Sequence, residues 1–125
     1  MHKLLFWVTI YTLMLAFSQI MLKLGLTKVG AISARHLKDL PLILLHLAQN
    51  SYVVFGTLLM ASSYFLWLAI LSWFKLSLAF PMTALGFIFV ALLSYFMLGE
   101  RLLWHNYLGI GFIALGIFLL LFKNV

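Results

Sequence analysis

Four long apolar segments set the strongest limit on what this chain can fold into. They run from about Leu4 to Leu24, Ser51 to Trp73, Leu76 to Leu98 and Trp104 to Phe122. A helix needs about 20 apolar residues to cross about 30 Å of hydrocarbon, and each segment meets that length. The segments are too long and too continuously apolar for barrel strands. The sequence therefore predicts an all-α integral membrane protein with four transmembrane helices.

Composition supports the same class. Of the 125 residues, 66% are hydrophobic and 8% are charged, whereas soluble domains carry about 25% charged residues. A soluble fold of this length could not bury so much apolar surface. Cysteine is absent, which excludes disulfides, thiol nucleophiles and cysteine metal sites. The net charge is +6, and the charged residues lie in loops and at helix ends. This pattern indicates membrane topology and contact with anionic headgroups rather than nucleic-acid binding.

Residues 1–125 are expected to form one domain with unequal loops. The second, third and fourth spans are joined by only a few residues and should form antiparallel hairpins. The first loop, Gly25 to Asn50, is long. It contains DLPLILLHL, which predicts a short interfacial helix with Asp39 as N-cap and Pro41 in the first turn. Alternatively, this segment extends the second span into a long, tilted helix. Four helices make a thin bundle, so oligomerisation is expected.

Polar side chains within the first span share one helix face. Thr9, Thr12, Ala16, Gln19 and Lys23 are spaced 3, 4, 3 and 4 residues apart. Such a face could line a hydrated groove, or it could pack closely against another helix through small residues and hydroxyls. Lys23 lies near the end of the span, where it could extend toward the interface or anchor a phosphate headgroup.

The acidic residues are too few to suggest a catalytic site. Asp39 and Glu100 are the only two, and both are predicted outside the hydrocarbon. Glu100 is either a helix-end carboxylate at the membrane surface or a proton or cation site. The four histidines have no metal-ligand spacing. We therefore expect no metal site, no cofactor and no enzymatic activity.

Two further features interrupt the apolar pattern. Pro81 breaks the early part of the third span, and Gly86 adds flexibility; broken helices occur in transporters where they face protein or a cavity. In the fourth span, Gly109 and Gly116 are seven residues apart and lie on one face. Their missing side chains would let another helix approach, either within the subunit or from a second one.

These segments resemble the drug/metabolite transporter superfamily. LSLAFPMTALGFIFVALLSYFMLGERL followed by NYLGIGFIALGIFLL is similar to the last two helices of a repeat in that family, including EamA-like proteins. The matching motifs are Ala79-Phe80-Pro81, Gly99-Glu100-Arg101, and the run from Gly109 through Ile113 to Gly116-Ile117. SQIMLKLG, residues 18–25, resembles the end of the family's first helix.

With its 125 residues, the chain resembles the four-helix small multidrug resistance branch, whose members work as dimers. That resemblance assigns Gly109, Ile113 and Gly116 to the dimer interface. One departure is important. This branch uses a membrane-buried glutamate for proton-coupled export of cationic drugs, and Leu15 occupies the corresponding position here. Phe80 and Thr83 occupy the positions of its third-helix tyrosine and tryptophan. A buried cation without a counter-charge is costly.

A sister group fits better. The paired small subunits that flip aminoarabinose-phosphoundecaprenol also lack that glutamate. They carry a Gln-x-x-x-Lys in the first helix and an Ala-Tyr-Pro-Met in the third, similar to Gln19 to Lys23 and to residues 79–82 here. The resemblance implies a multi-pass protein of the bacterial inner membrane that flips or exports a lipid-linked anionic substrate, as a homodimer or with a similar subunit.

On this hypothesis the substrate phosphate would meet Lys23, Arg35 or Lys38, while Gln19, Thr12 and Thr9 would form hydrogen bonds to the headgroup. Glu100 would lie at the exit turn, and Pro81 and Gly86 would let the third helix bend. Two alternatives remain open. One is a small multidrug resistance-type exporter of cations that uses Glu100 or a partner's acid. The other is a membrane scaffold that does not transport.

Overall fold

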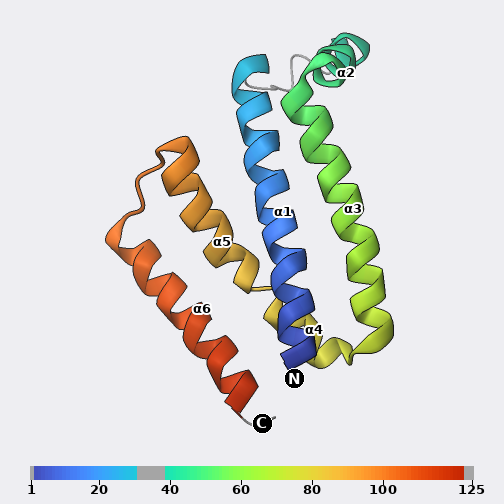
Figure 1. Cartoon of the computed structure of the whole chain (residues 1–125). Coiled ribbons are helices and arrows are strands. Elements are labelled where there is room, and N and C mark those ends of the chain that lie inside the picture. Colours follow the sequence, from blue (N-terminus) through green and yellow to red (C-terminus); the bar gives the residue numbers. More distant parts are fainter. Residues whose placement is uncertain (1, 31–38, 123–125) are drawn as a thin grey trace.

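The computed structural model describes residues 2–30 and 39–122, and all of its regular elements are helices (Figure 1). They are α1 (His2–Val29), α2 (Leu40–Gln49), α3 (Ser51–Trp73), α4 (Leu76–Met82), α5 (Leu85–Leu93), the π-helical η2 (Ser94–Leu98) and α6 (Trp104–Phe122). Four helical stretches are long and apolar enough to cross a membrane: α1, α3, Leu76–Leu98 and α6. This confirms the all-α membrane fold class with a short helix in the first loop.

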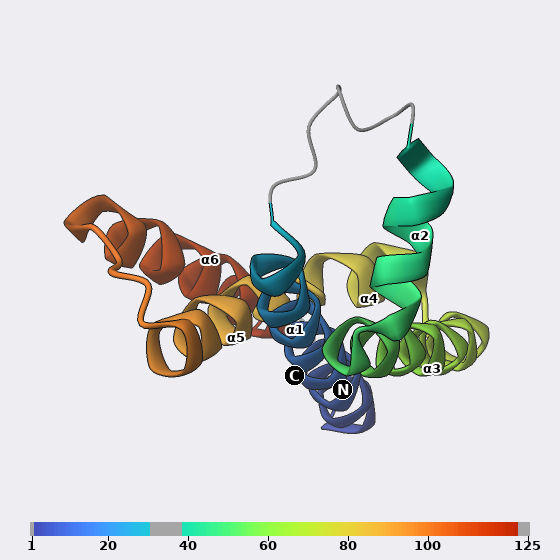
Figure 2. The same ribbon diagram turned by 90° about the horizontal axis from the view of Figure 1, so that it is seen from above.

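The first loop differs in detail from the sequence expectation. Helix α1 continues to Val29, where Gly30 takes a φ of +92° that favours glycine. Asp39 occupies the N-cap position of α2 and Pro41 lies in its first turn, as predicted, although the Asp39 side chain forms no capping hydrogen bond. Helix α2 is separated from α3 by the extended residue Asn50. Figure 2 shows α2 turned away from the axis of α3, so it is not an extension of that helix.

Helices α1 and α3 lie side by side (Figure 1) because small residues let their backbones approach. A Cβ at Gly56 would lie 3.0 Å from both the Leu22 Cγ and the Ser18 carbonyl oxygen. A Cβ at Gly25 would lie 2.5 Å from the Val53 Cγ2. Neither glycine has room for a side chain, so this pair of contacts sets the spacing of the two helices.

The buried core lies toward the end of the bundle that holds the N-terminus. It consists of Leu4, Val8, Ile70, Ala79 and Met82, contributed by α1, α3 and α4. Aromatic side chains pack around it. The rings of Trp7 and Trp73 are 5.5 Å apart, and those of Tyr11 and Trp67 stack at 5.1 Å. This end of the molecule is therefore held together by three helices.

The third span is broken two residues after its proline. Pro81 has no N–H to donate, and the following bonds span three residues instead of four: Ala84 N–H to the Pro81 carbonyl at 3.1 Å and Gly86 N–H to the Thr83 carbonyl at 2.8 Å. The span ends in the π-helical turn and at Gly99, whose φ of +66° is left-handed. The chain therefore changes direction within the membrane segment.

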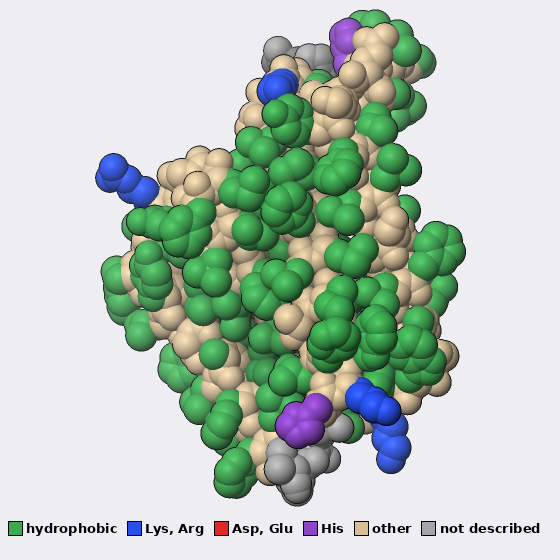
Figure 3. Space-filling model, in the orientation of Figure 1, with side chains coloured by type: hydrophobic (Ala, Val, Ile, Leu, Met, Phe, Trp, Pro, Cys, Tyr) green, Lys and Arg blue, Asp and Glu red, His purple; other side chains and the backbone are tan. Residues whose placement is uncertain are grey.

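Helix α6 packs at the edge of the molecule, mainly against α5 (Figures 1 and 2). Its large side chains are mostly exposed; Phe112, for example, is 72% exposed. Hydrophobic side chains cover the middle of the face in Figure 3, while Lys and Arg lie toward its ends and its edge. That distribution suits a bundle whose flanks contact hydrocarbon.

Candidate functional site

The polar face of α1 has two halves with different surroundings. In the inner half, Thr12 and Ala16 are fully buried and Thr9 is half-buried. The Thr12 hydroxyl donates to the Val8 carbonyl at 2.8 Å, with the Thr9 carbonyl at 3.1 Å. This half packs against α5, since the position of a Cβ on Gly86 lies 3.8 Å from Thr12. Close packing is thus the role of Thr12 within the single subunit.

The outer half of the same face is open. Gln19 and Lys23 are exposed, whereas α3 packs on a different side of α1, at Ser18, Leu22 and Gly25. Within the described residues, neither side chain has a hydrogen bond or an ion pair in the subunit. Figure 1 shows α5 leaning away from α1 toward this end. A cation and an amide, one helical turn apart, therefore face away from the core of the subunit.

Of the remaining predicted charges, only Glu100 falls within the described residues. Arg35 and Lys38 lie outside the described residues. Glu100 is exposed in the turn after Gly99, and its backbone N–H donates to the Ser94 carbonyl at 3.3 Å. The other acidic residue, Asp39, precedes α2. The four spanning helices therefore carry no carboxylate. Among the described residues, no group of three or more His, Cys, Asp or Glu could hold a metal ion.

The two predicted hinge residues lie in different environments. Pro81 is half-buried and immediately precedes the break, which falls at Thr83 and Ala84. The Phe80 carbonyl accepts both from the Thr83 hydroxyl at 2.6 Å and from the Thr83 backbone N–H at 3.0 Å. Gly86 is buried inside α5, against α1. The interruption is therefore next to the proline, and the glycine provides a close helix contact.

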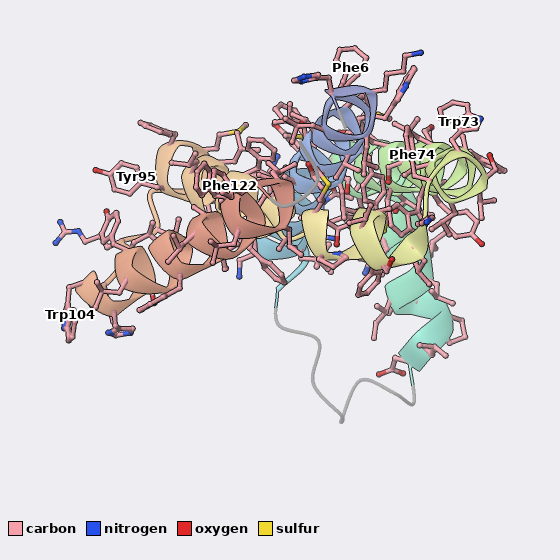
Figure 4. All side chains as sticks on the ribbon, turned by 90° about the horizontal axis from the view of Figure 1, so that it is seen from below. Phe6, Trp73, Phe74, Tyr95, Trp104 and Phe122 are labelled. Atoms are coloured by element: carbon pink, nitrogen blue, oxygen red, sulfur yellow. The ribbon has the colours of Figure 1, made fainter. Side chains whose placement is uncertain are left out.

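The predicted interface residues lie on the peripheral helix. Gly109 and Gly116 are exposed, and a Cβ at either would meet nothing within 4 Å. Ile113 is half-buried. Figure 4 shows α6 at the outer edge of the bundle, with Trp104 and Phe122 at its two ends. The glycine face of α6 therefore has no helix packed on it within the described part of the subunit.

One polar feature was missed by sequence reasoning. Lys28 and His46 line a common hollow with Val29, Gln49 and Asn50 where α1, α2 and α3 meet. Lys28 and His46 are far apart in sequence and were considered only as loop or helix-end residues. The only indication in the sequence was that both residues lie near ends of predicted helices on the same side of the membrane.

These features define a class. A bundle of four membrane-crossing helices, with a broken third span and an open polar face on α1, is the architecture of a small membrane transporter subunit. Its polar atoms lie on helix faces and at helix ends, where a substrate crossing the membrane would meet them.

Comparison with known proteins agrees with this class. The chain is 36% identical over 81 residues to the probable 4-amino-4-deoxy-L-arabinose-phosphoundecaprenol flippase subunit ArnE of Pectobacterium atrosepticum. The match covers 61% of this chain and 72% of that protein. No family model and no solved structure matches the chain.

The chain therefore belongs to the same family as this flippase subunit, a family of small membrane transporters similar to the small multidrug resistance proteins. Together with the four apolar helices, this makes it a multi-pass protein of the bacterial inner membrane. Its family is one of transport proteins rather than of enzymes.

Proposed function

We propose that the chain is one subunit of a flippase that moves a polyprenyl-phosphate-linked sugar across the inner membrane. The observation that carries this proposal is the open polar face of α1, where Lys23 and Gln19 are exposed and no spanning helix offers a carboxylate. A cationic side chain there suits a phosphate, and it does not suit a cationic drug. The name of the relative, a phosphoundecaprenol flippase subunit, supports the same substrate class.

In this mechanism the protein binds and guides; it makes and breaks no covalent bonds. The Lys23 ammonium and the Gln19 amide have hydrogen-bond donors for a phosphodiester and for sugar hydroxyls. The polyprenyl chain stays in the hydrocarbon beside the apolar flanks of the bundle. The break after Pro81 lets α4 and α5 change their angle, so that the polar face opens to one side of the membrane and then to the other.

The polar face of one subunit cannot enclose a headgroup, so a second subunit is needed to cover it. We place the contact between subunits on α6, along Gly109, Ile113 and Gly116. The partner is a second copy of this chain or a similar small subunit. Two such bundles would place two broken third spans around a shared crossing path.

The proposed interface predicts a variant that loses the dimer and keeps the fold. Gly116→Leu adds a large side chain on a face with no neighbour within 4 Å, so the helical content and melting temperature of the subunit should stay unchanged. The close approach of two α6 helices would be blocked. We expect native mass spectrometry to show mainly dimers for the wild type and mainly monomers for the variant. An equally dimeric variant would place the interface elsewhere.

The substrate class is tested by transport in liposomes. The protein, alone or with a similar subunit, is reconstituted with an aminosugar-phosphoundecaprenol, and the headgroup exposed on each leaflet is measured by chemical labelling. Equilibration that requires the protein supports a flippase. Cells that express the chain should gain no resistance to quaternary ammonium compounds. Resistance that is lost in a Glu100→Gln variant, without lipid flipping, would instead identify an exporter of cations.

A further inference from the structure

A polar hollow lies where α1, α2 and α3 meet, apart from the polar face of α1. It has a volume of about 400 Å³ and is lined by Lys28, Val29, His46, Gln49 and Asn50. The Lys28 Nζ lies 4.2 Å from the centroid of the Tyr52 ring, a distance at which the ring face attracts an ammonium group. The lysine is thus held over one side of the hollow.

Asn50 fixes the geometry of this corner. Its Nδ2 donates to the Gly25 carbonyl at 3.1 Å, and its Oδ1 accepts from the Tyr52 and Val53 backbone N–H groups at 3.0 and 3.4 Å. One side chain therefore caps α3 and ties it to α1. This tie holds the end of α2 close to the last turn of α1, so that Lys28 and His46 reach the same hollow.

The side chains that line the hollow suit an anion. The ammonium of Lys28 and the amide of Gln49 have N–H donors, and the imidazole of His46 can donate from a ring nitrogen. Among the described residues that line the hollow there is no carboxylate, and the chain has only two acidic residues against eight Lys and Arg. Hydrogen bonds between such donors and a phosphate are of the strong, charge-assisted kind.

A second hollow, lined mainly by apolar side chains, lies between α2 and α3. It has a volume of about 360 Å³, and its lining includes Leu47, Val53, Val54 and Leu58. The polar hollow thus lies beside apolar helix surface at the end of membrane-crossing helices, and a lipid has both a phosphate for the hollow and a hydrocarbon chain for that surface. A free phosphate would use only the polar hollow.

We propose that this corner binds the phosphate headgroup of an anionic membrane lipid. Lys28, His46 and Gln49 contact the phosphate, and the hydrocarbon chain lies along the apolar flank of the bundle. The site is separate from the polar face of α1, because five residues place Lys28 roughly 140° around the helix from Lys23. The inference does not depend on the proposed substrate, since ordinary anionic phospholipids carry the same phosphate.

The test uses the full chain in detergent micelles with equal amounts of phosphatidic acid and phosphatidylcholine of the same acyl chains. Native mass spectrometry measures how much of each lipid stays bound. The wild type should retain phosphatidic acid preferentially, and Lys28→Ala should lower that retention about tenfold, as expected for the loss of one charge-assisted hydrogen bond. Lys3→Ala, which removes an exposed lysine from the opposite end of α1, is the matched control and should bind as the wild type does.

Three outcomes would overturn the proposal. The first is equal retention of phosphatidic acid by the Lys28→Ala and Lys3→Ala variants, and the second is no preference of the wild type for phosphatidic acid. The third is complete displacement of the lipid by inorganic phosphate, which would identify a site for free phosphate. Circular dichroism checks the fold of each variant. If Lys28→Ala loses helicity, Lys28→Gln, which keeps much of the side-chain stem near Tyr52, provides the same comparison.

Discussion

Replacing Gly56 of α3 with Val is expected to destabilise the bundle more than the same change at a glycine of α6. The new Cβ would lie 3.0 Å from the Leu22 Cγ and from the Ser18 carbonyl oxygen, and the backbone oxygen cannot move away without moving α1. Overpacking of this kind costs about 1–3 kcal/mol. The thermal unfolding midpoint in detergent, followed by circular dichroism, should fall by several degrees.

Gly111→Val is the matched control for this change. It introduces the same side chain into a helix, so the intrinsic helix propensity changes equally, but a Cβ at Gly111 meets nothing within 4 Å. We expect the control to melt close to the wild type. If the two variants melt at the same temperature, the close contact of α1 and α3 does not determine the stability of the bundle.

The four spans could be predicted because their signal is local. Each is a continuous apolar stretch of membrane-crossing length, and backbone hydrogen bonding in hydrocarbon leaves a helix as the outcome. The interruption of the third span was also expected, since Pro81 lacks an N–H. The N-cap position of Asp39 before α2 was also predicted, but its side chain forms no hydrogen bond to the backbone there.

The contacts between spans could not be predicted in the same way. Gly25 and Gly56 are ordinary glycines in their own segments, and only the pairing of α1 with α3 makes them positions without room. The hydrogen bond from Asn50 to Gly25 likewise joins residues 25 positions apart. Such contacts depend on the relative rotation of two helices, which an apolar pattern on all sides does not determine.

The polar face of α1 illustrates the same limit within one helix. Periodicity correctly placed Thr12 and Gln19 on one side, yet Thr12 is buried and Gln19 is exposed. The difference comes from α5, which packs on α1 at Gly86 and leans away beyond it (Figure 1). This face was predicted either to line a groove or to pack against a helix, and its two halves differ in this respect.

Replacing Lys23 with Ala is expected to reduce flipping of a phosphate-linked lipid by about ten- to a hundredfold, because one charge-assisted hydrogen bond to a phosphate contributes about 1.5–3 kcal/mol. The fold should be unaffected. Lys23 is exposed, and within the described residues it has no partner in the subunit. The measurement is the rate of headgroup equilibration in liposomes that contain equal amounts of wild-type or variant protein.

Two further variants separate a specific role of Lys23 from a general effect of charge. Lys23→Arg keeps the positive charge and should keep much of the transport, since guanidinium also binds phosphate. Lys3→Ala removes an exposed lysine near the N-terminus of the same helix and should transport at the wild-type rate. If Lys23→Ala transports normally, the lysine only extends to the headgroup region, and the substrate phosphate must be held by other residues. If Lys3→Ala is equally slow, the effect reflects the total positive charge of the helix, and the open face of α1 loses its assigned role.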